Sequence, residues 1–172
     1  MKKIIISIIF ALFSISSFAQ SELFYVDKYA HRELDNYHRK WTEWSDWKDA
    51  KDASVKVSMK YDKNLIEFTS VDEYRIRYEH YKLKDYWGII QEDDGTISCS
   101  YTASYSSVFD RGEDCYVTLA QETNGNRYIY IQFRTRQFFI YIKEFRNMSD
   151  QGRVKYKYFF DGFKKDNSLL SR

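Results

Sequence analysis

The sequence contains no proline and only six glycines in 172 residues, so few positions interrupt a regular backbone. It also contains no internal repeat, low-complexity stretch or linker-like segment. Aromatic residues are instead abundant, at 19% of the chain, and aromatic side chains are enriched in β-strands. The composition therefore favours a β-rich protein with few breaks.

The sequence also lacks the motifs of common enzyme classes. Its three histidines, His31, His38 and His80, are isolated, and none belongs to a pair with zinc-site spacing. There is no Gly-x-Ser-x-Gly nucleophile elbow and no glycine-rich phosphate loop. We therefore predict no catalytic residues, no metal, no cofactor and no enzymatic activity. A hydrolase built from scattered acidic residues is the remaining enzymatic alternative.

The charge of the chain disfavours a nucleic-acid partner. The formal net charge of +2 comes from 27 basic and 25 acidic residues, and Lys2 and Lys3 account for the whole excess. Nucleic-acid binding depends on a surplus of positive charge, which the rest of the chain lacks.

The first 19 residues have the pattern of an export signal. Two lysines precede an apolar run over residues 4–13, and the small residues Ser17 and Ala19 follow in a signal-peptidase pattern. The apolar run is shorter than the roughly 20 residues that span a bilayer, which disfavours an uncleaved anchor. We predict cleavage near Ala19 and a periplasmic or secreted protein with no transmembrane segment in the mature chain. Residues 20–172 are predicted to form a single β-rich domain.

Most of the remaining chain alternates apolar and polar residues, as in strands with one buried face. Val55, Val57 and Met59, for example, alternate with serine and lysine. The pairs Asp94-Gly95 and Asn124-Gly125 are typical of hairpin turns. The predicted strands cover residues 54–62, 65–70, 72–80, 86–91, 96–102, 114–120, 127–133, 137–145 and 154–160.

The short spacing of these strands predicts the fold class. Strands that follow one another without intervening helices pair with their neighbours in an antiparallel meander. We therefore predict an all-β protein whose meander closes into a lipocalin-like barrel or folds into a β-sandwich. A short helix or a loose tail is expected at the C-terminus, from residue 163.

The two cysteines, Cys99 and Cys115, are predicted to form a structural disulfide. An exported chain folds in an oxidising compartment, and both cysteines lie in strand-like segments. If these segments form a hairpin with Cys99 opposite Cys115, then Ile97 lies opposite Val117. The C-x-x-C spacing of redox-active pairs is absent.

Three tryptophans, Trp41, Trp44 and Trp47, follow one another at three-residue spacing in the sequence WTEWSDW. Across residues 30–47 the apolar spacing suits one face of a helix, but many of the residues are mediocre helix formers. A strand hairpin is the alternative. Large aromatic side chains are usually buried for their area, so we expect core or strand-edge tryptophans and keep a ligand platform as the second hypothesis.

The segments WTEWSDW, LIEFTS, GEDCYVTL and YIYIQF, with the Asn-Gly turn between the last two, carry a resemblance. Together they resemble a group of small exported bacterial all-β proteins without an assigned activity. The resemblance covers most of the mature chain. It implies that residues 23–34 and 37–48 form a strand hairpin that turns near Asp35 and Asn36.

The sixteen tyrosines suggest a binding function. A tyrosine inside a barrel offers apolar area and one hydroxyl group, which suits an amphipathic ligand. We predict an exported, non-enzymatic binding module for a small amphipathic molecule or a glycan. The candidate ligand-binding residues are Trp41, Trp44, Trp47, Tyr61, Tyr74 and Tyr78.

The alternative function is a protein-interaction or inhibitor domain. The serine-rich residues 103–109 are predicted to form a mobile loop, and such loops often carry binding sites. Held by the predicted disulfide, a loop over residues 103–114 would present Tyr105, Phe109 and Arg111 to an envelope protein. Aromatic and arginine side chains are common anchors of protein interfaces.

Overall fold

Antiparallel strands make up nearly all of the described structure. The structure is a computed structural model that describes residues 21–50, 55–71, 76–108, 111–144 and 158–163. The predicted export signal lies outside these residues. A short 3₁₀ helix covers Tyr61–Lys63, and the four-residue helix α3 covers Tyr158–Asp161. The strands are β1 (Ser21–Asp35), β2 (Lys40–Trp41), β3 (Lys48–Asp49), β4 (Val55–Lys60), β5 (Leu65–Val71), β6 (Ile76–Gln91), β7 (Ile97–Ser107), β8 (Arg111–Gln121), β9 (Arg127–Gln132) and β10 (Arg136–Glu144).

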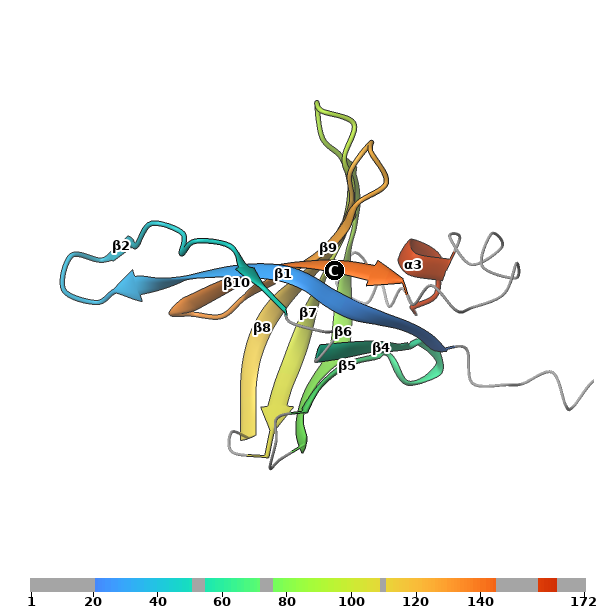
Figure 1. Cartoon of the computed structure of the whole chain (residues 1–172), viewed down its shortest axis with the longest axis horizontal. Coiled ribbons are helices and arrows are strands. Elements are labelled where there is room, and N and C mark those ends of the chain that lie inside the picture. Colours follow the sequence, from blue (N-terminus) through green and yellow to red (C-terminus); the bar gives the residue numbers. More distant parts are fainter. Residues whose placement is uncertain (1–20, 51–54, 72–75, 109–110, 145–157, 164–172) are drawn as a thin grey trace, which may run out of the picture.

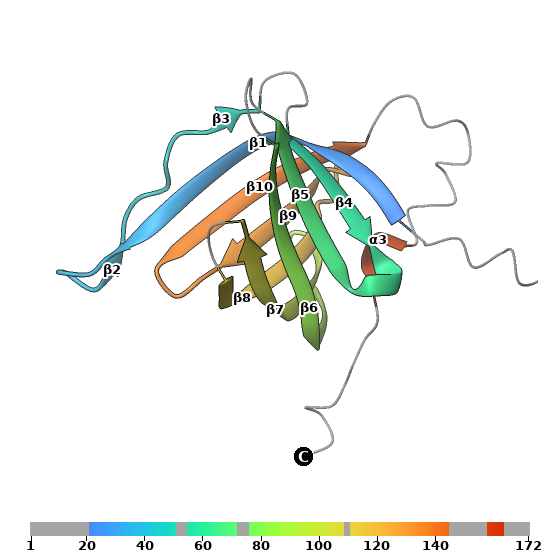
Figure 2. The same ribbon diagram turned by 90° about the horizontal axis from the view of Figure 1, so that it is seen from below.

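Eight of these strands form a closed barrel. Each strand from β4 to β10 pairs with the next one along the chain, and β1 pairs with both β4 and β10. The closing pair runs from Phe24 opposite Glu144 to Glu33 opposite Arg136. Figure 2 shows β1 crossing the barrel diagonally and continuing beyond its wall to β2. The predicted all-β meander is thus confirmed as a lipocalin-like barrel, and the β-sandwich alternative is wrong.

The alternation in the sequence decides which side chains fill the barrel. On β4, Val57 and Met59 are buried, and Ile129 and Ile131 are buried on β9. Aromatic side chains occupy much of the interior, where they form one cluster with other buried residues from every barrel strand. This interior cluster includes Phe24, Ile66, Phe68, Tyr81, Leu83, Tyr101, Tyr105, Val117, Leu119, Phe133, Ile140 and Ile142.

Two hairpin turns confirm the glycine signals in the sequence. Gly95 and Gly125 have positive φ angles of 83° and 89°, which glycine adopts without strain. Each glycine N–H donates to the carbonyl of a glutamate three residues earlier, Glu92 or Glu122, at 2.9 Å. A Cβ atom on Gly95 would lie 2.6 Å from the side chain of Thr123, so the two turns approach each other closely (Figure 1).

The chain turns back after β1 near Asp35, as the hairpin alternative predicted, and the helical alternative is wrong. The predicted second strand over residues 37–48 is present only as β2 and the start of β3, because residues 42–47 form no strand. The chain turns after β1, and Asp35 accepts hydrogen bonds from the N–H groups of Tyr37 and His38. It then returns beside β1, where β2 pairs at Leu34 and Asp35 and β3 pairs at Lys28 and Tyr29. The return is irregular between β2 and β3.

Helix α3 closes one end of the barrel. Phe159 is fully buried and its ring lies 6.0 Å from that of Phe24, while the Phe163 ring lies 4.6 Å from that of Tyr61. The predicted strand over residues 154–160 is therefore wrong at 158–160, which are helical. Phe159 is on the helix and Phe163 follows its end, so the short helix and the bend after it bring both rings to the barrel end, whereas a strand would continue past it.

The predicted disulfide is wrong because the strand register differs from the expected one. Cys99 lies opposite Leu119 and Cys115 lies opposite Ala103, so the two cysteines are four residues apart along the β7–β8 ladder. That offset corresponds to about 13 Å, and a disulfide requires Cα atoms within about 7 Å. Both thiols are buried in the barrel, and no disulfide joins them.

This register leads to a first prediction. An excess of dithiothreitol is expected to leave the midpoint of thermal unfolding unchanged within about 1 °C, because no cross-link constrains the unfolded chain. Burial raises the pKa of the Cys115 thiol to about 12, so alkylation should require denaturation. Mass spectrometry after non-reducing, denaturing alkylation should then show both cysteines labelled. A single intramolecular disulfide in that experiment would contradict the register.

Candidate functional site

The end of the barrel opposite α3 holds an apolar pocket of about 200 Å³, which we call the mouth pocket. It lies inside the barrel, where β4 begins, β5 ends and β6 begins. Its walls come from five strands and are mainly aliphatic and aromatic. The lining residues are Val26, Tyr29, Val55, Phe68, Ser70, Glu79, Phe138 and Ile140.

Two polar residues of the mouth pocket, Ser70 and Glu79, lie on neighbouring strands, and a third, Tyr29, is on β1. Ser70 is at the end of β5, and Glu79 is exposed near the start of β6. The Tyr81 hydroxyl donates a hydrogen bond to Glu79 Oε2 at 3.2 Å. Burial, together with the nearby Glu79 carboxylate, raises the pKa of Tyr81 well above its ordinary value, so its hydroxyl remains a donor. The carboxylate of Glu79 retains lone pairs for a ligand.

A partly exposed ion pair lies at the edge of the aromatic side chains next to the pocket. Arg136 Nη2 lies 2.8 Å from Glu113 Oε2. The guanidinium carbon of Arg136 lies 4.4 Å from the centre of the Phe133 ring and 5.8 Å from that of Tyr105. These two rings also pack against Tyr81, whose ring lies 5.5 Å from that of Phe68 in the pocket wall.

Trp41, Trp44 and Trp47 lie outside the barrel rather than in its core. Trp44 and Trp47 are 37% and 48% exposed and pack on the ring of Phe139 at 6.3 and 5.7 Å. Together with side chains from β9 and β10 they form a layer that we call the outer aromatic layer. Its members are Trp41, Trp44, Trp47, Tyr128, Tyr130, Phe139 and Tyr141.

Two cations from β1 complete the outer aromatic layer. Lys28 Nζ lies 4.9 Å from the centre of the Trp47 ring, and the guanidinium carbon of Arg32 lies 4.6 Å from that of Trp44. Cations at such distances are attracted by the ring faces. The tryptophan faces are thus already occupied in part by the protein's own side chains, which favours a structural role over an open ligand platform.

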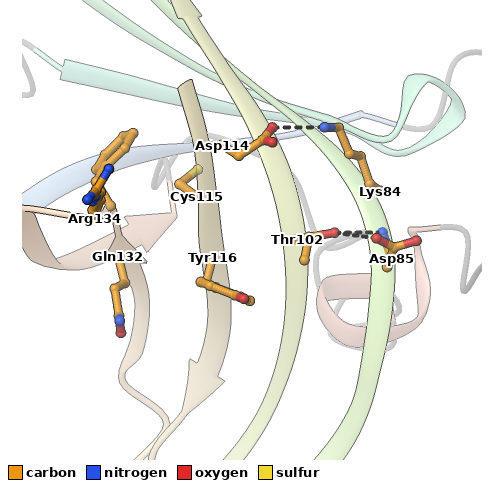
Figure 3. Close-up of a pocket in the computed structure, with 9 residues that line it drawn as sticks. Lys84, Asp85, Thr102, Asp114, Cys115, Tyr116, Gln132 and Arg134 are labelled. Atoms are coloured by element: carbon orange, nitrogen blue, oxygen red, sulfur yellow. Dashed lines mark hydrogen bonds and ion pairs between the residues drawn. The ribbon is translucent and has the colours of Figure 1, made fainter. Parts of the chain in front are cut away.

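A second cavity, the outer cleft, lies on the outer wall across β6 to β9 and has a volume of about 390 Å³ (Figure 3). Lys84 Nζ lies 2.9 Å from Asp114 Oδ1 across it. The hydroxyl of Thr102 donates to Asp85 Oδ2 at 2.8 Å. The lining residues are Lys84, Asp85, Thr102, Asp114, Cys115, Tyr116, Gln132, Phe133 and Arg134.

The remaining tyrosines predicted to bind ligand do not gather at one site. Tyr61 is buried at the α3 end, and its hydroxyl donates to Glu22 Oε2 at 2.7 Å. Tyr78 was expected to face inward, but it is exposed because Tyr81 and Leu83 set the inward phase of β6. Tyr74 lies outside the described residues.

The predicted interaction loop is also different in the structure. Strand β7 continues to Ser107, so residues 103–107 are not a loop. Tyr105 points into the barrel and is buried, because it shares the inward phase of Tyr101 and Ala103. Phe109 lies outside the described residues, and Arg111 begins β8.

The sequence did not identify the residues of the mouth pocket. Ser70 and Glu79 are ordinary polar residues in strand-like segments, and nothing in their neighbourhood distinguishes them. The sequence could have indicated Glu79 only through its spacing from Tyr81 and Leu83. These two residues face inward, and Glu79, two residues before Tyr81 on the same strand, faces the same side.

Within the described ranges, no three histidine, cysteine, aspartate or glutamate side chains form a group that could hold a metal ion. None of the helices in the described part of the chain has the length and apolar character needed to cross a membrane.

The fold and its mouth pocket define a closed, lipocalin-like β-barrel with one plugged end. No protein-family model, curated protein or solved structure matches the chain. The resemblance noted from the sequence segments therefore stays a prediction.

Proposed function

We propose that the protein is an exported, non-enzymatic binding module that holds a small amphipathic molecule in the mouth pocket. One observation carries the proposal: an apolar pocket with a carboxylate at its edge lies inside the barrel at the end opposite α3. Small-molecule sites typically combine apolar walls with a few polar groups in this way. The N-terminal residues 1–19 support export.

The dimensions and charge of the pocket narrow the ligand class. A volume of about 200 Å³ holds roughly seven groups of the size of a water molecule, at about 30 Å³ each. Among the described residues that line the pocket, Glu79 is the one with a charged side chain. The ligand should therefore have a short apolar body and a polar end that donates hydrogen bonds or carries a positive charge.

A titration with three six-carbon probes tests this proposal. Hexylamine, hexanol and hexanoate share one apolar chain and differ in the polar end. We expect hexylamine to bind most tightly and hexanoate most weakly, because the Glu79 carboxylate attracts an ammonium and repels a carboxylate. Isothermal calorimetry or amide chemical shifts of the pocket strands would measure the three affinities.

Three variants locate the binding. Glu79→Gln should reduce the affinity for hexylamine by about three- to tenfold and leave that for hexanol unchanged. Val55→Phe places a larger side chain in the pocket and should weaken all probes. Glu92→Gln, in the exposed turn at the other end of the barrel, is the matched control. Tightest binding of hexanoate, or probe binding that Val55→Phe does not change, would refute the proposal.

The protein-interaction alternative has less support. It required Tyr105 on a protruding loop, whereas Tyr105 packs between Tyr81 and Phe133 inside the barrel.

A further inference from the structure

The outer cleft is separate from the mouth pocket and differs from it in character. Most of its walls are outward-facing side chains of β6, β7, β8 and β9 (Figure 3), and none of its lining residues lines the mouth pocket. Its volume of about 390 Å³ is nearly twice that of the mouth pocket and falls in the range of small-molecule sites. Its lining is rich in hydrogen-bonding groups, so the two cavities suit different ligands.

The charges of the outer cleft balance. Lys84 and Asp114 lie 2.9 Å apart and neutralise each other. Among the described lining residues, the remaining charged side chains are one cation, Arg134, and one anion, Asp85. A site with two positive and two negative groups does not favour a ligand with a large net charge of either sign.

Several hydrogen-bonding groups border the same space. Arg134 makes no hydrogen bond or ion pair with any described residue, so its five N–H donors are available to a ligand. Gln132 accepts a long hydrogen bond of 3.4 Å from Tyr130 through its oxygen, which leaves its amide N–H groups as donors. Asp85 and Asp114 retain lone pairs as acceptors. A ligand that both donates and accepts along its whole length fits this arrangement.

An aromatic surface borders the cleft. Tyr116 lines it and is 50% exposed, and Trp87 is 57% exposed with its ring centre 6.3 Å from that of Tyr116. Among the described residues, no cation lies over either ring in the way that Lys28 and Arg32 lie over Trp47 and Trp44. An exposed ring face next to hydrogen-bonding groups suits a molecule with an apolar C–H face and polar edges.

We propose that the outer cleft binds a neutral saccharide, with one sugar ring packed on Tyr116 and its hydroxyl groups bonded to Asp85, Gln132 and Arg134. Sugar hydroxyls donate and accept at once, and the faces of a pyranose ring present C–H groups to an aromatic ring. The balanced charges favour a neutral sugar over an acidic one. The outer cleft is independent of the mouth pocket. If the cleft binds no saccharide, the proposal that the mouth pocket binds an amphipathic molecule is unchanged.

The test uses three neutral tetrasaccharides: cellotetraose, maltotetraose and chitotetraose. We expect at least one to shift the amide resonances of β7, β8 and β9. Tyr116→Ala should weaken that binding by about three- to tenfold, while Tyr116→Phe, which keeps the ring, should bind within about twofold of the parent. Because Tyr116 is half exposed, neither variant should unfold the barrel.

Controls separate this site from other surfaces. Tyr37→Ala removes an exposed aromatic side chain in the turn before β2 and should leave saccharide binding unchanged. Hexylamine binding in the mouth pocket should be the same in Tyr116→Ala and in the parent. Three outcomes would overturn the proposal: no shift with any tetrasaccharide, shifts that map to Trp44 and Trp47, or tighter binding of the zwitterion glycine than of the sugars.

Discussion

Replacing Phe159 with alanine is expected to lower the free energy of unfolding by about 3–5 kcal/mol, the usual cost of removing a buried phenylalanine. Phe159 has 0% exposure and fills the α3 end of the barrel. Its ring packs edge-on against Phe24 at 6.0 Å, and the guanidinium carbon of Arg127 lies 5.2 Å from its centre. The substitution removes the apolar area and also exposes these neighbours to a cavity.

Chemical denaturation followed by circular dichroism would measure the Phe159→Ala effect. Phe160→Ala is the matched control, because Phe160 is on the same helix but only half-buried, and its effect should be clearly smaller. A loss below about 1 kcal/mol for Phe159→Ala would mean that α3 does not unfold together with the barrel. Helix α3 would then not be a stable plug, and the two ends of the barrel would not differ in being closed or open.

The strands could be predicted because the sequence alternates and because its turns carry glycine. Val57 and Met59 on β4, and Ile129 and Ile131 on β9, face inward as their pattern requires. Closure into a barrel depends on β1 reaching both β4 and β10, which is a long-range pairing. Alternation within single strands does not contain that information, so the sandwich could not be excluded.

The register of β7 and β8 could not be predicted for a related reason. Alternation specifies which face a side chain occupies, so it fixes a register only to the nearest two residues. The expected pairing of Cys99 with Cys115 and the observed pairing of Cys115 with Ala103 differ by four residues and bury the same side chains. The observed register goes with a longer β7 than expected. The strand continues through several serines to Ser107, so the turn to β8 comes later in the chain.

The candidate sites were harder to predict than the strands. The mouth pocket combines residues from β1, β4, β5, β6 and β10, and only the closed barrel brings them together. Tyr78 was assigned to the wrong face because it lies near the strand start, where few inward neighbours set the phase. The exposed rings of Trp87 and Tyr116 come from different strands, and their proximity depends on the β6–β7–β8 register.

The tryptophan segment provides the second large prediction, centred on Phe139. The Phe139 ring contacts Trp44 and Trp47 from the returning segment, and it stacks on Tyr128 from β9 at 4.3 Å. It is therefore the link between the barrel wall and the tryptophans. Lys28 and Arg32 lie on the same rings and reinforce this link.

Phe139→Ala is expected to lower the free energy of unfolding by about 2–3 kcal/mol, less than for a fully buried ring because Phe139 is partly exposed. Trp44 and Trp47 would lose their apolar contact, so tryptophan fluorescence should shift to longer wavelength in the folded protein. Trp44→Ala, which removes one partner and keeps the centre of the layer, should cost about 1 kcal/mol. An unchanged emission spectrum with a loss below about 1 kcal/mol would show that the tryptophans rest on the wall without stabilising it, and would restore the ligand platform as their role.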